Sequence, residues 1–419
     1  MTATVDPSLG GLADRLAAGG VRWAVIRGET DRPSGDDLDL LVHPEDASAF
    51  RSIARDLGFP RLPAWGHGEH AFHVGRGTGG WWRLDLLTTF RFLGGERLAD
   101  DVVPAVLERR TGDRIPRLST EDTAWALVLH LLLDKDGVSD QNRARLAAAA
   151  DAPAAGPLAE ALAAALPRGW SPERARTTLA SETEDPARLA ALRRAVSRRL
   201  RPGNPPARLG WMAWRARDTM AGRLRKPMTA LYRRGPSVAL LGPDGAGKSH
   251  LVHELPKAFP LDVRTFYLGL YPAGSEHHRG PKGLGFVLRL GGMWRRYAGA
   301  RVQQLRGRLA LFDRHPFDAR LTPRQRPRRV DRVRRAILGH ALPAPDLVLI
   351  LDAPGDVLYA RKPEHPADVL EAEMIRYREL AGRLPRAELV DATRSPEAVL
   401  DDVVGRIWRV WGRRLDGGR

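Results

Sequence analysis

The segment Gly242–Ser249 reads GPDGAGKS, and it constrains the fold of this chain more than any other feature. An apolar stretch, PSVALLG, ends at its first residue, and a helix-forming stretch begins at Lys248. This spacing of glycine, lysine and serine between a strand and a helix is the signature of a phosphate-binding loop. Gly245 and Gly247 let the backbone turn its N–H groups inward around a polyphosphate, and the following helix points its positive end at the same anion. The segment therefore predicts a site for the polyphosphate of a nucleotide.

The residues of this loop have separate expected parts in binding ATP and Mg²⁺. Lys248 is expected to reach the β- and γ-phosphates, and the hydroxyl of Ser249 is expected to ligate Mg²⁺. ATP and Mg²⁺ are therefore the expected cofactors. The predicted ATP-binding residues are Gly242, Pro243, Asp244, Gly245, Ala246, Gly247, Lys248, Ser249 and His250.

Strands and helices alternate from Pro236 to the C-terminal region, which predicts a parallel α/β sheet covered on both faces. A buried parallel strand reads as a continuous apolar run, as PSVALLG does, and four further apolar strands are predicted after it. The predicted strands are 236–242, 263–268, 308–312, 347–351 and 388–390. The predicted helices are 248–258, 284–304, 327–339, 355–362, 367–382 and 396–413.

Charged residues that follow two of these strands favour a kinase acting on a small molecule. The chain has no N-K-x-D motif for guanine and no LSGGQ-like segment of a transporter ATPase. Asp313 and Arg314 end one apolar strand, where a carboxylate can hold Mg²⁺ or accept a proton and the guanidinium can grip an acceptor phosphate. Asp352 ends another strand, and Arg361 and Lys362 follow its helix, where cations can close over a transferring phosphoryl group. The predicted catalytic residues are Lys248, Asp313, Arg314, Arg361 and Lys362, with Ser249 and Asp313 as metal ligands.

At these motifs residues 235–419 resemble the thymidylate kinase-like family of P-loop nucleotide kinases. The loop matches the family's GxDGxGKS/T, Asp313-Arg314-His315 matches its DR turn, and Leu351-Asp352 through Arg361 matches its LDxxxxxxxxR element. The resemblance implies ATP as donor, Mg²⁺, and transfer to a nucleotide, nucleoside or similar small phosphate-bearing acceptor. It also implies that Asp244 and Arg314 face the acceptor and that Arg361 and Lys362 belong to a lid. The family's acidic-Pro-Gly turn after the second strand is replaced here by FYLGLYPAGSEHHRG.

The N-terminal part carries a second pattern, built on carboxylates. Asp37 and Asp39 lie two residues apart in a predicted strand, 37–42, and so point to one face. Asp85 lies in another predicted strand, 82–87. Clustered carboxylates repel one another unless cations lie between them, as in a two-metal site for nucleotidyl transfer. The alternative is an amphipathic strand whose alternate aspartates face water.

Residues 20–90 resemble the nucleotidyltransferase superfamily that includes DNA polymerase β, in its minimal bacterial form. The resemblance implies an α+β fold, with Asp37, Asp39 and Asp85 as metal ligands and the helices of 119–150 as an appended part. The family has Gly-Gly or Gly-Ser where this chain has Gly28-Glu29. The sequence pattern also predicts a strand at 22–26 and helices at 9–18 and 44–57.

Composition and charge divide the chain into four predicted parts. These are a nucleotidyltransferase-like domain at 1–115, a helical extension at 116–192, a basic connector at 193–234 and a P-loop kinase domain at 235–419. The net charge is +17, and residues 193–234 hold 13 Arg and Lys against one Asp, while 279–336 hold 17 against three Asp. Such segments attract phosphate on nucleotides, nucleic acid or membranes. The segment 210–228, with its tryptophans, is expected to pack the two domains together, with an interfacial lipid-binding helix as the alternative.

Three functions are therefore open at the level of sequence. The first is the kinase, the second is nucleotidyl transfer by the N-terminal carboxylates with the P-loop domain supplying substrate, and the third is an ATP-switched module that binds nucleic acid or a membrane surface. Nucleic acid has no motif in support, since neither a helix-turn-helix nor an RNP-like pattern occurs. Cysteine is absent, and no secretory signal or apolar run of about 18 residues is present. We expect a cytoplasmic protein.

Overall fold

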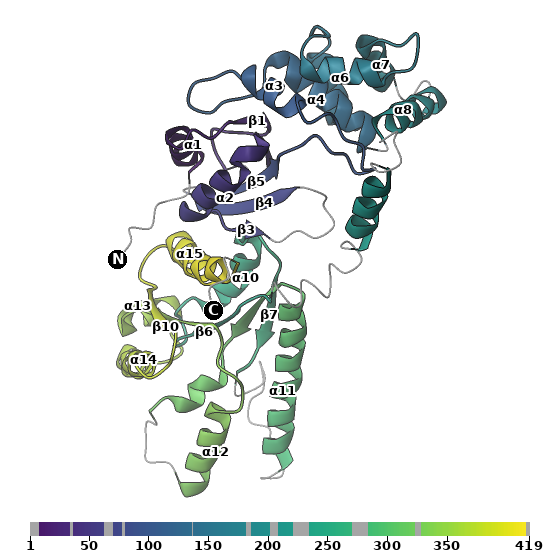
Figure 1. The fold of residues 1–419 in the computed structure, drawn as a ribbon. Coiled ribbons are helices and arrows are strands. Elements are labelled where there is room, and N and C mark those ends of the chain that lie inside the picture. The colour runs from purple at the N-terminus through teal and green to yellow at the C-terminus, as the bar shows by residue number, and fades with distance from the viewer. Residues whose placement is uncertain are drawn as a thin grey trace. The chain divides into compact units, whose positions relative to one another are not determined.

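The computed structural model describes residues 8–33, 37–62, 70–77, 80–135, 137–181, 186–201, 208–220, 234–269, 284–322 and 328–415. The chain divides into two compact units, Met1–Arg225 and Lys226–Arg419, which are described separately (Figure 1). The proline-rich PGNPP at 202–206 and residues 221–228 of the predicted tryptophan helix lie outside the described residues. In the described part, no helix has the length and apolar character needed to cross a bilayer.

The second unit is built on a five-stranded parallel sheet in the order β10-β9-β6-β8-β7. The strand that leads into the Gly242–Ser249 loop, β6, is central and fully buried, as its unbroken apolar run predicts. Its strands are β6 (Ser237–Leu241), β7 (Val263–Tyr267), β8 (Leu309–Asp313), β9 (Leu347–Asp352) and β10 (Ala387–Asp391). Its helices are α10 (Lys248–Ala258), α11 (Leu284–Leu305), α12 (Arg329–Gly339), α13 (Gly355–Arg361), α14 (Ala367–Ala381) and α15 (Pro396–Leu415), with a 3-10 turn at Pro316–Arg320.

Helices cover both faces of this sheet. Ala239, Phe312 and Val348 stand side by side across β6, β8 and β9, so they share one face. That face packs against α11 and α12 at one end and against α14 at the other. The opposite face is covered by α10 and α15, which lie next to each other (Figure 1). The structure therefore is α/β with a parallel sheet, as the sequence predicts.

The first unit holds a five-stranded mixed sheet in the order β1-β2-β5-β4-β3. Leu38, Leu40 and Val42 alternate along β2 toward a core shared with α1 and α2. Asp37 and Asp39 therefore occupy the opposite face of the sheet. The strands are β1 (Trp23–Arg27), β2 (Asp37–Val42), β3 (Arg61–Leu62), β4 (Ala71–Gly77) and β5 (Gly80–Leu87), and the two helices are α1 (Leu9–Ala18) and α2 (Ala47–Asp56).

A helical layer follows the sheet in the first unit and packs, with Ala24 and Leu41 of the sheet, into a large apolar core around the fully buried Trp125. Ser119 caps the longest helix of the 119–166 region, since its hydroxyl accepts a hydrogen bond from the Asp122 N–H at 3.1 Å. The helices are α3 (Val102–Glu108), α4 (Thr120–Leu133), α5 (Asp140–Ala148), α6 (Pro157–Ala165), α7 (Pro172–Ala180) and α8 (Pro186–Leu200). Residues 193–200 of the predicted connector thus belong to α8.

The tryptophan-bearing part of the predicted connector is a helix over residues 208–220. Its Trp211 donates a hydrogen bond from Nε1 to the Gly95 carbonyl at 3.1 Å, and the guanidinium of Arg91 lies 4.5 Å from the ring centre of Trp214. These contacts hold the helix against the first unit. The four-part division of the chain that the sequence suggests stays a prediction.

Candidate functional site

The loop between β6 and α10 is curled by three glycines. Gly242, Gly245 and Gly247 have φ of 140°, 83° and 96°, a region that side-chain-bearing residues rarely adopt. A Cβ placed on Gly245 would lie 2.5 Å from the Leu358 carbonyl oxygen, so only glycine fits there. At Gly247 a Cβ would meet nothing within 4 Å. The loop therefore packs tightly on α13 at one glycine and is open at the other.

Lys248, the first residue of α10, is held inside the curl of the loop. Its Nζ donates to the carbonyl oxygens of Gly242 at 2.8 Å and Pro243 at 2.6 Å, and it lies 3.8 Å from a carboxylate oxygen of Asp244. The residue is only 7% exposed. Burial, together with the nearby charge of Arg314, lowers the pKa of Lys248 to about 8. The amine is therefore a buried cation whose hydrogen bonds all go to its own loop and can be exchanged for phosphate oxygens.

Asp244 and Arg314 form an ion pair beside the loop. The Arg314 guanidinium donates to the Asp244 carboxylate at 2.7 Å. Burial opposes the charge of Asp244, but Lys248, Arg314 and Lys362 outweigh it and lower the pKa of this carboxyl. The two residues that the sequence assigned to the acceptor side are thus brought together, although that role stays a prediction.

An unusual backbone conformation places Arg314. Its φ is 64°, in the left-handed region, and its N–H donates to the Leu240 carbonyl at 3.2 Å. Non-glycine residues are held in this region only when the surrounding structure requires it. A second carboxylate, Asp318, lies 4.0 Å from Arg314 and accepts a hydrogen bond from the Tyr377 hydroxyl at 3.1 Å. Burial raises the pKa of Asp318 to about 6. Asp318 and Tyr377 were not predicted from the sequence, where Asp318 stands four residues after Arg314 in DRHPFD.

Asp313 ends β8, directly across from Leu240 of β6, and it is half-buried. Its charge acts on Lys248, so it lies within electrostatic reach of the loop. Ser249 and His250 follow Lys248 in the first turn of α10, and both are exposed. The hydroxyl of Ser249 and the carboxylate of Asp313 are oxygen ligands of the type that Mg²⁺ prefers. The curled backbone, the buried amine and these oxygens fit a polyphosphate with Mg²⁺.

The two predicted lid cations have local partners. The Arg361 guanidinium donates to the Ala392 carbonyl at 2.8 Å, and Lys362 lies 3.0 Å from Glu364. The carboxylate of Asp352 is bound by Arg378 at 2.7 Å, and Arg378 also contacts Glu371. The sequence analysis missed Arg378, which comes from α14.

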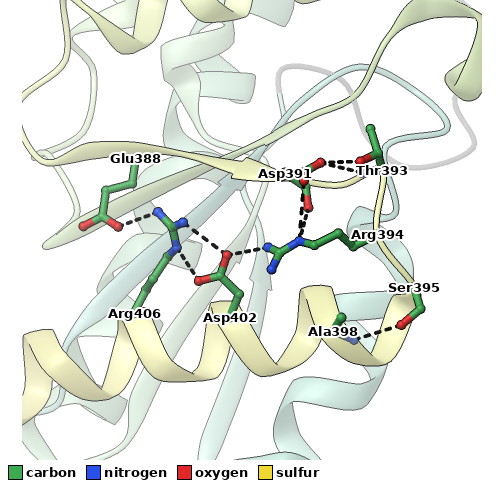
Figure 2. A network of polar contacts seen from close by, with 8 residues as sticks. All are labelled: Glu388, Asp391, Thr393, Arg394, Ser395, Ala398, Asp402 and Arg406. Atoms are coloured by element: carbon green, nitrogen blue, oxygen red, sulfur yellow. Dashed lines mark hydrogen bonds and ion pairs between the residues drawn. The ribbon is translucent and has the colours of Figure 1, made fainter. Parts of the chain in front are cut away.

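The turn that receives Arg361 is fixed by a network after β10 (Figure 2). Asp402 on α15 accepts from Arg394 at 2.6 Å and from Arg406 at 2.8 Å, and Arg406 also reaches Glu388 on β10 at 2.8 Å. Thr393 donates both its N–H and its hydroxyl to Asp391. The turn after β10 is therefore tied to α15 by ion pairs, and Arg361 donates to that turn at Ala392.

The first unit contains a separate cavity of about 700 Å³ on the face of the sheet that carries Asp39. Its volume lies in the range of small-molecule sites, roughly 300–1,000 Å³. One part of its wall is apolar, with Leu87, Phe90 and Leu127, and another part is ionic. The charged and histidine residues in its lining are Arg27, Asp39, His70, Asp85, Arg91, Arg117, His130, Asp134 and Arg145.

Asp39 and Asp85 lie directly opposite each other on the parallel strands β2 and β5. Asp39 is 2.6 Å from the Arg27 guanidinium, and both carboxylate oxygens of Asp85 are 2.9 Å from Nδ1 of His70. Burial raises the pKa of Asp39 despite its partner. Burial alone would lower the pKa of His70, but the hydrogen bond to Asp85 and the negative charges of Asp85, Asp134 and Asp39 together outweigh it, and the pKa is raised. Arg27 and His70 were missed by the sequence analysis; the antiparallel register of β1 and β2 pairs Arg27 with Asp39.

The predicted metal trio of the first unit is brought partly together. Asp37 follows the same strand face as Asp39, beside Arg83 of β5. Among the residues that the structure describes, no group of three or more His, Asp or Glu side chains is arranged to hold a metal ion. A metal at Asp39 and Asp85 would have to displace Arg27 and His70. Metal binding by Asp37, Asp39 and Asp85 stays a prediction.

Comparisons with known proteins give little beyond this geometry. No protein-family profile matches the sequence, and no curated protein matches it. Among solved structures, a deoxyadenosine kinase from M. mycoides with dCMP and dCDP bound is 15% identical, covers 40% of this chain and 97% of its own, and has a TM-score of 0.31. A thymidylate kinase from Candida albicans is 16% identical, covers 42% of this chain and 91% of its own, and has a TM-score of 0.30. TM-scores this low do not establish a common fold, so the fold class rests on the sheet order and on the loop between β6 and α10 of this chain.

Proposed function

We propose that the second unit is an ATP- and Mg²⁺-dependent phosphotransferase that acts on a nucleotide, a nucleoside or a similar small phosphate-bearing acceptor. One observation carries this proposal. The Lys248 amine is buried inside a curled glycine loop, and the Asp244–Arg314 ion pair stands beside it. A buried cation with exchangeable carbonyl partners is prepared to receive an anion, and the neighbouring guanidinium supplies a second anion site.

The residues of the site have distinct parts in such a transfer. The backbone N–H groups of Gly245 to Ser249 and the Lys248 amine would bind the donor polyphosphate and neutralise charge that develops on the transferred group. Arg314, poised by its backbone conformation, would exchange Asp244 for an acceptor phosphate and orient the acceptor. Asp313 would accept the acceptor's proton or help to hold the metal. Mg²⁺, held by the Ser249 hydroxyl, would supply neutralisation of the phosphate charge.

Arg361 and Lys362 would act from the α13 side of the loop. Lys362 contributes to the lowered pKa of Asp244, so its charge reaches the loop in this arrangement. Arg361 is anchored on the Ala392 carbonyl. We propose that Lys362 binds the polyphosphate and that Arg361, through its hydrogen bond to Ala392, holds the end of α13 that carries Lys362 in place.

The test is a product assay on the full chain with ATP and Mg²⁺ over a panel of nucleosides, nucleotides and other phosphate esters, scoring ADP, AMP and pyrophosphate together. The proposal expects ADP that depends on one class of acceptor and falls about 10²–10³-fold in Lys248→Ala, as loss of one charge-stabilising donor does. Lys257→Ala is the matched control, because Lys257 lies on the same helix and is exposed and paired with Glu254. Acceptor-independent ADP alone, equal in both variants, would contradict the proposal.

A second candidate function is nucleotidyl transfer by the first unit. The observation that favours it is the in-register pairing of Asp39 with Asp85 at the wall of a ligand-sized cavity. In that case the same assay yields pyrophosphate, which is lost in Asp39→Asn and Asp85→Asn and survives Lys248→Ala. Pyrophosphate that survives all three substitutions would exclude the cavity as its source.

A further inference from the structure

The helices α11 and α12 leave a set of large apolar side chains exposed. On α11, Val287 and Leu288 are 62% and 66% exposed, and on α12, Val330 and Val333 are 60% and 58% exposed. The two helices pack together through their buried sides, in a cluster that holds Leu338, and the Arg334 guanidinium of α12 lies 5.9 Å from the ring centre of Phe286. Phe286 directly precedes the exposed pair of α11, and Arg334 directly follows Val333, so the exposed pairs of the two helices lie near this contact. The two helices are here called the α11–α12 arm (Figure 1).

The apolar exposure continues along α11 as a regular stripe. Exposed positions recur every three or four residues, the period of one helix face. An apolar residue or glycine occupies six exposed positions with this spacing: Val287, Gly291, Trp294, Ala298, Val302 and Leu305. The other exposed residues in the described part of α11 are Leu288 and Arg295. A helix face that is exposed to water ordinarily carries charged or polar residues. An exposed apolar face of this kind marks a surface that binds a partner or a membrane.

The arm is also strongly basic. Each of the two helices contains four arginines, and together they contain one aspartate. Arg295, Arg328, Arg329 and Arg332 are exposed, and within the described part of the chain they have no acidic partner. These arginines and the exposed apolar side chains beside them are complementary to a surface that carries dense negative charge over an apolar interior.

Charge decides between the surfaces that could cover this arm. A second copy of the chain would bring the same excess of arginine against itself, and like charges across an interface cost binding energy. An anionic lipid surface offers phosphate to the arginines and acyl chains to Val287, Leu288 and Trp294. Interfacial helices with this pattern bury their apolar face about 5–10 Å into the headgroup region.

We propose that the α11–α12 arm docks the protein on an anionic membrane surface. The apolar side chains of the arm enter the headgroup region, and the arginines contact lipid phosphates. The inference does not depend on the proposed phosphotransferase activity, because none of its residues belongs to the loop site.

The test is vesicle co-sedimentation of the full chain with phosphatidylcholine alone and with phosphatidylcholine mixed with phosphatidylglycerol. Binding is expected on the anionic vesicles only, and it is expected to weaken as ionic strength rises. The triple variant Arg328→Gln, Arg329→Gln and Arg332→Gln is expected to bind about a hundredfold more weakly, at about 1 kcal/mol for each arginine near the surface. The matched control removes the same charge from exposed sites on other helices and turns of the same unit, at Arg383, Arg409 and Arg413.

A second variant tests the apolar part without changing charge. Leu288→Ser with Val333→Ser is expected to weaken vesicle binding at least tenfold while leaving the thermal unfolding midpoint unchanged, since both side chains are exposed. Equal loss of binding in the control variant would overturn the proposal, because net charge alone would then explain it. No binding to anionic vesicles, together with a dimer in light scattering that the Leu288→Ser and Val333→Ser pair dissociates, would assign the face to a second copy instead.

Discussion

The two units hold their candidate site residues in opposite ways. In the second unit Lys248 is bound by the carbonyls of Gly242 and Pro243, six and five residues away in the chain. In the first unit Asp39 is bound by Arg27 from a neighbouring strand, and Asp85 by His70, fifteen residues away. The binding of Lys248 is therefore a product of local sequence, although the Asp244–Arg314 pair beside it joins residues 70 apart, whereas the cavity site depends on how the sheet pairs. The loop also presents a cation with exchangeable partners, while the cavity presents carboxylates that already have partners in Arg27 and His70.

Substitutions of the loop glycines are expected to have the largest effect among the tests of this difference. Gly245→Ala places a Cβ 2.5 Å from the Leu358 oxygen at a φ of 83°, so we expect the free energy of unfolding of the second unit to fall by about 2–5 kcal/mol. Gly247→Ala has open space around its Cβ and meets only the backbone strain, about 1–2 kcal/mol. Denaturant unfolding of both variants measures the difference, and equal losses would show that the loop does not pack on α13 as described.

Arg314 tests the acceptor side of the loop. Arg314→Ala removes the guanidinium that faces Asp244, and we expect kcat/KM for the acceptor to fall about 100-fold, a loss typical of a charge-assisted contact to a phosphate. The KM for ATP should change little. Arg314→Lys restores charge without the planar fork and should recover only part of the loss. A rise confined to the KM for ATP would instead place Arg314 on the donor side.

The lowered pKa of Lys248 predicts a pH dependence of ATP binding at the loop site. Below a pH of about 8 the amine is charged, and above it the free protein loses this cation. ATP affinity should therefore fall by up to about tenfold between pH 7 and pH 9, because binding must then take up a proton. Lys248→Arg keeps its charge over this range, so its ATP affinity should be nearly flat with pH. A wild-type affinity that stays constant to pH 9 would contradict burial of the amine.

Asp39 gives the smallest expected effect. Asp39→Asn removes the ion pair between Asp39 and Arg27. The Asp39 side chain is 15% exposed, so a double-mutant cycle with Arg27→Gln should give a coupling energy of about 1 kcal/mol. Formation of ADP should change less than about twofold, since the cavity lies in the other unit. A large loss of ADP in Asp39→Asn would show that the two sites are not independent.

The sequence predicted most of the second unit because its signals are local. The helix 248–258 is confirmed residue for residue, and the strand expected at 347–351 is confirmed one residue longer, as Leu347–Asp352. Unbroken apolar strands and the glycine loop identify themselves without knowledge of their neighbours. Arg378 was missed because its carboxylate partner, Asp352, is 26 residues away on another element.

In the first unit, only some of the strands and helices could be predicted from local sequence patterns. The strand Asp37–Val42 and the helix Leu9–Ala18 are confirmed at their predicted bounds. The strand β4, Ala71–Gly77, was not predicted, because AFHVGRG has glycines and no clean alternation and is fixed by pairing with β5. The partner of Asp85, His70, directly precedes β4, and the partner of Asp39 is placed by the pairing of β1 with β2, so no pattern in the sequence alone could have supplied them.

The central claim is that the loop between β6 and α10 holds the polyphosphate of ATP. Calorimetric titration of ATP into the full chain, with and without Mg²⁺, tests it most directly. We predict a single site that Mg²⁺ strengthens, that Lys248→Ala abolishes and that Lys257→Ala leaves intact. Absence of ATP binding, or binding that persists in Lys248→Ala and disappears in Asp39→Asn, would contradict the account.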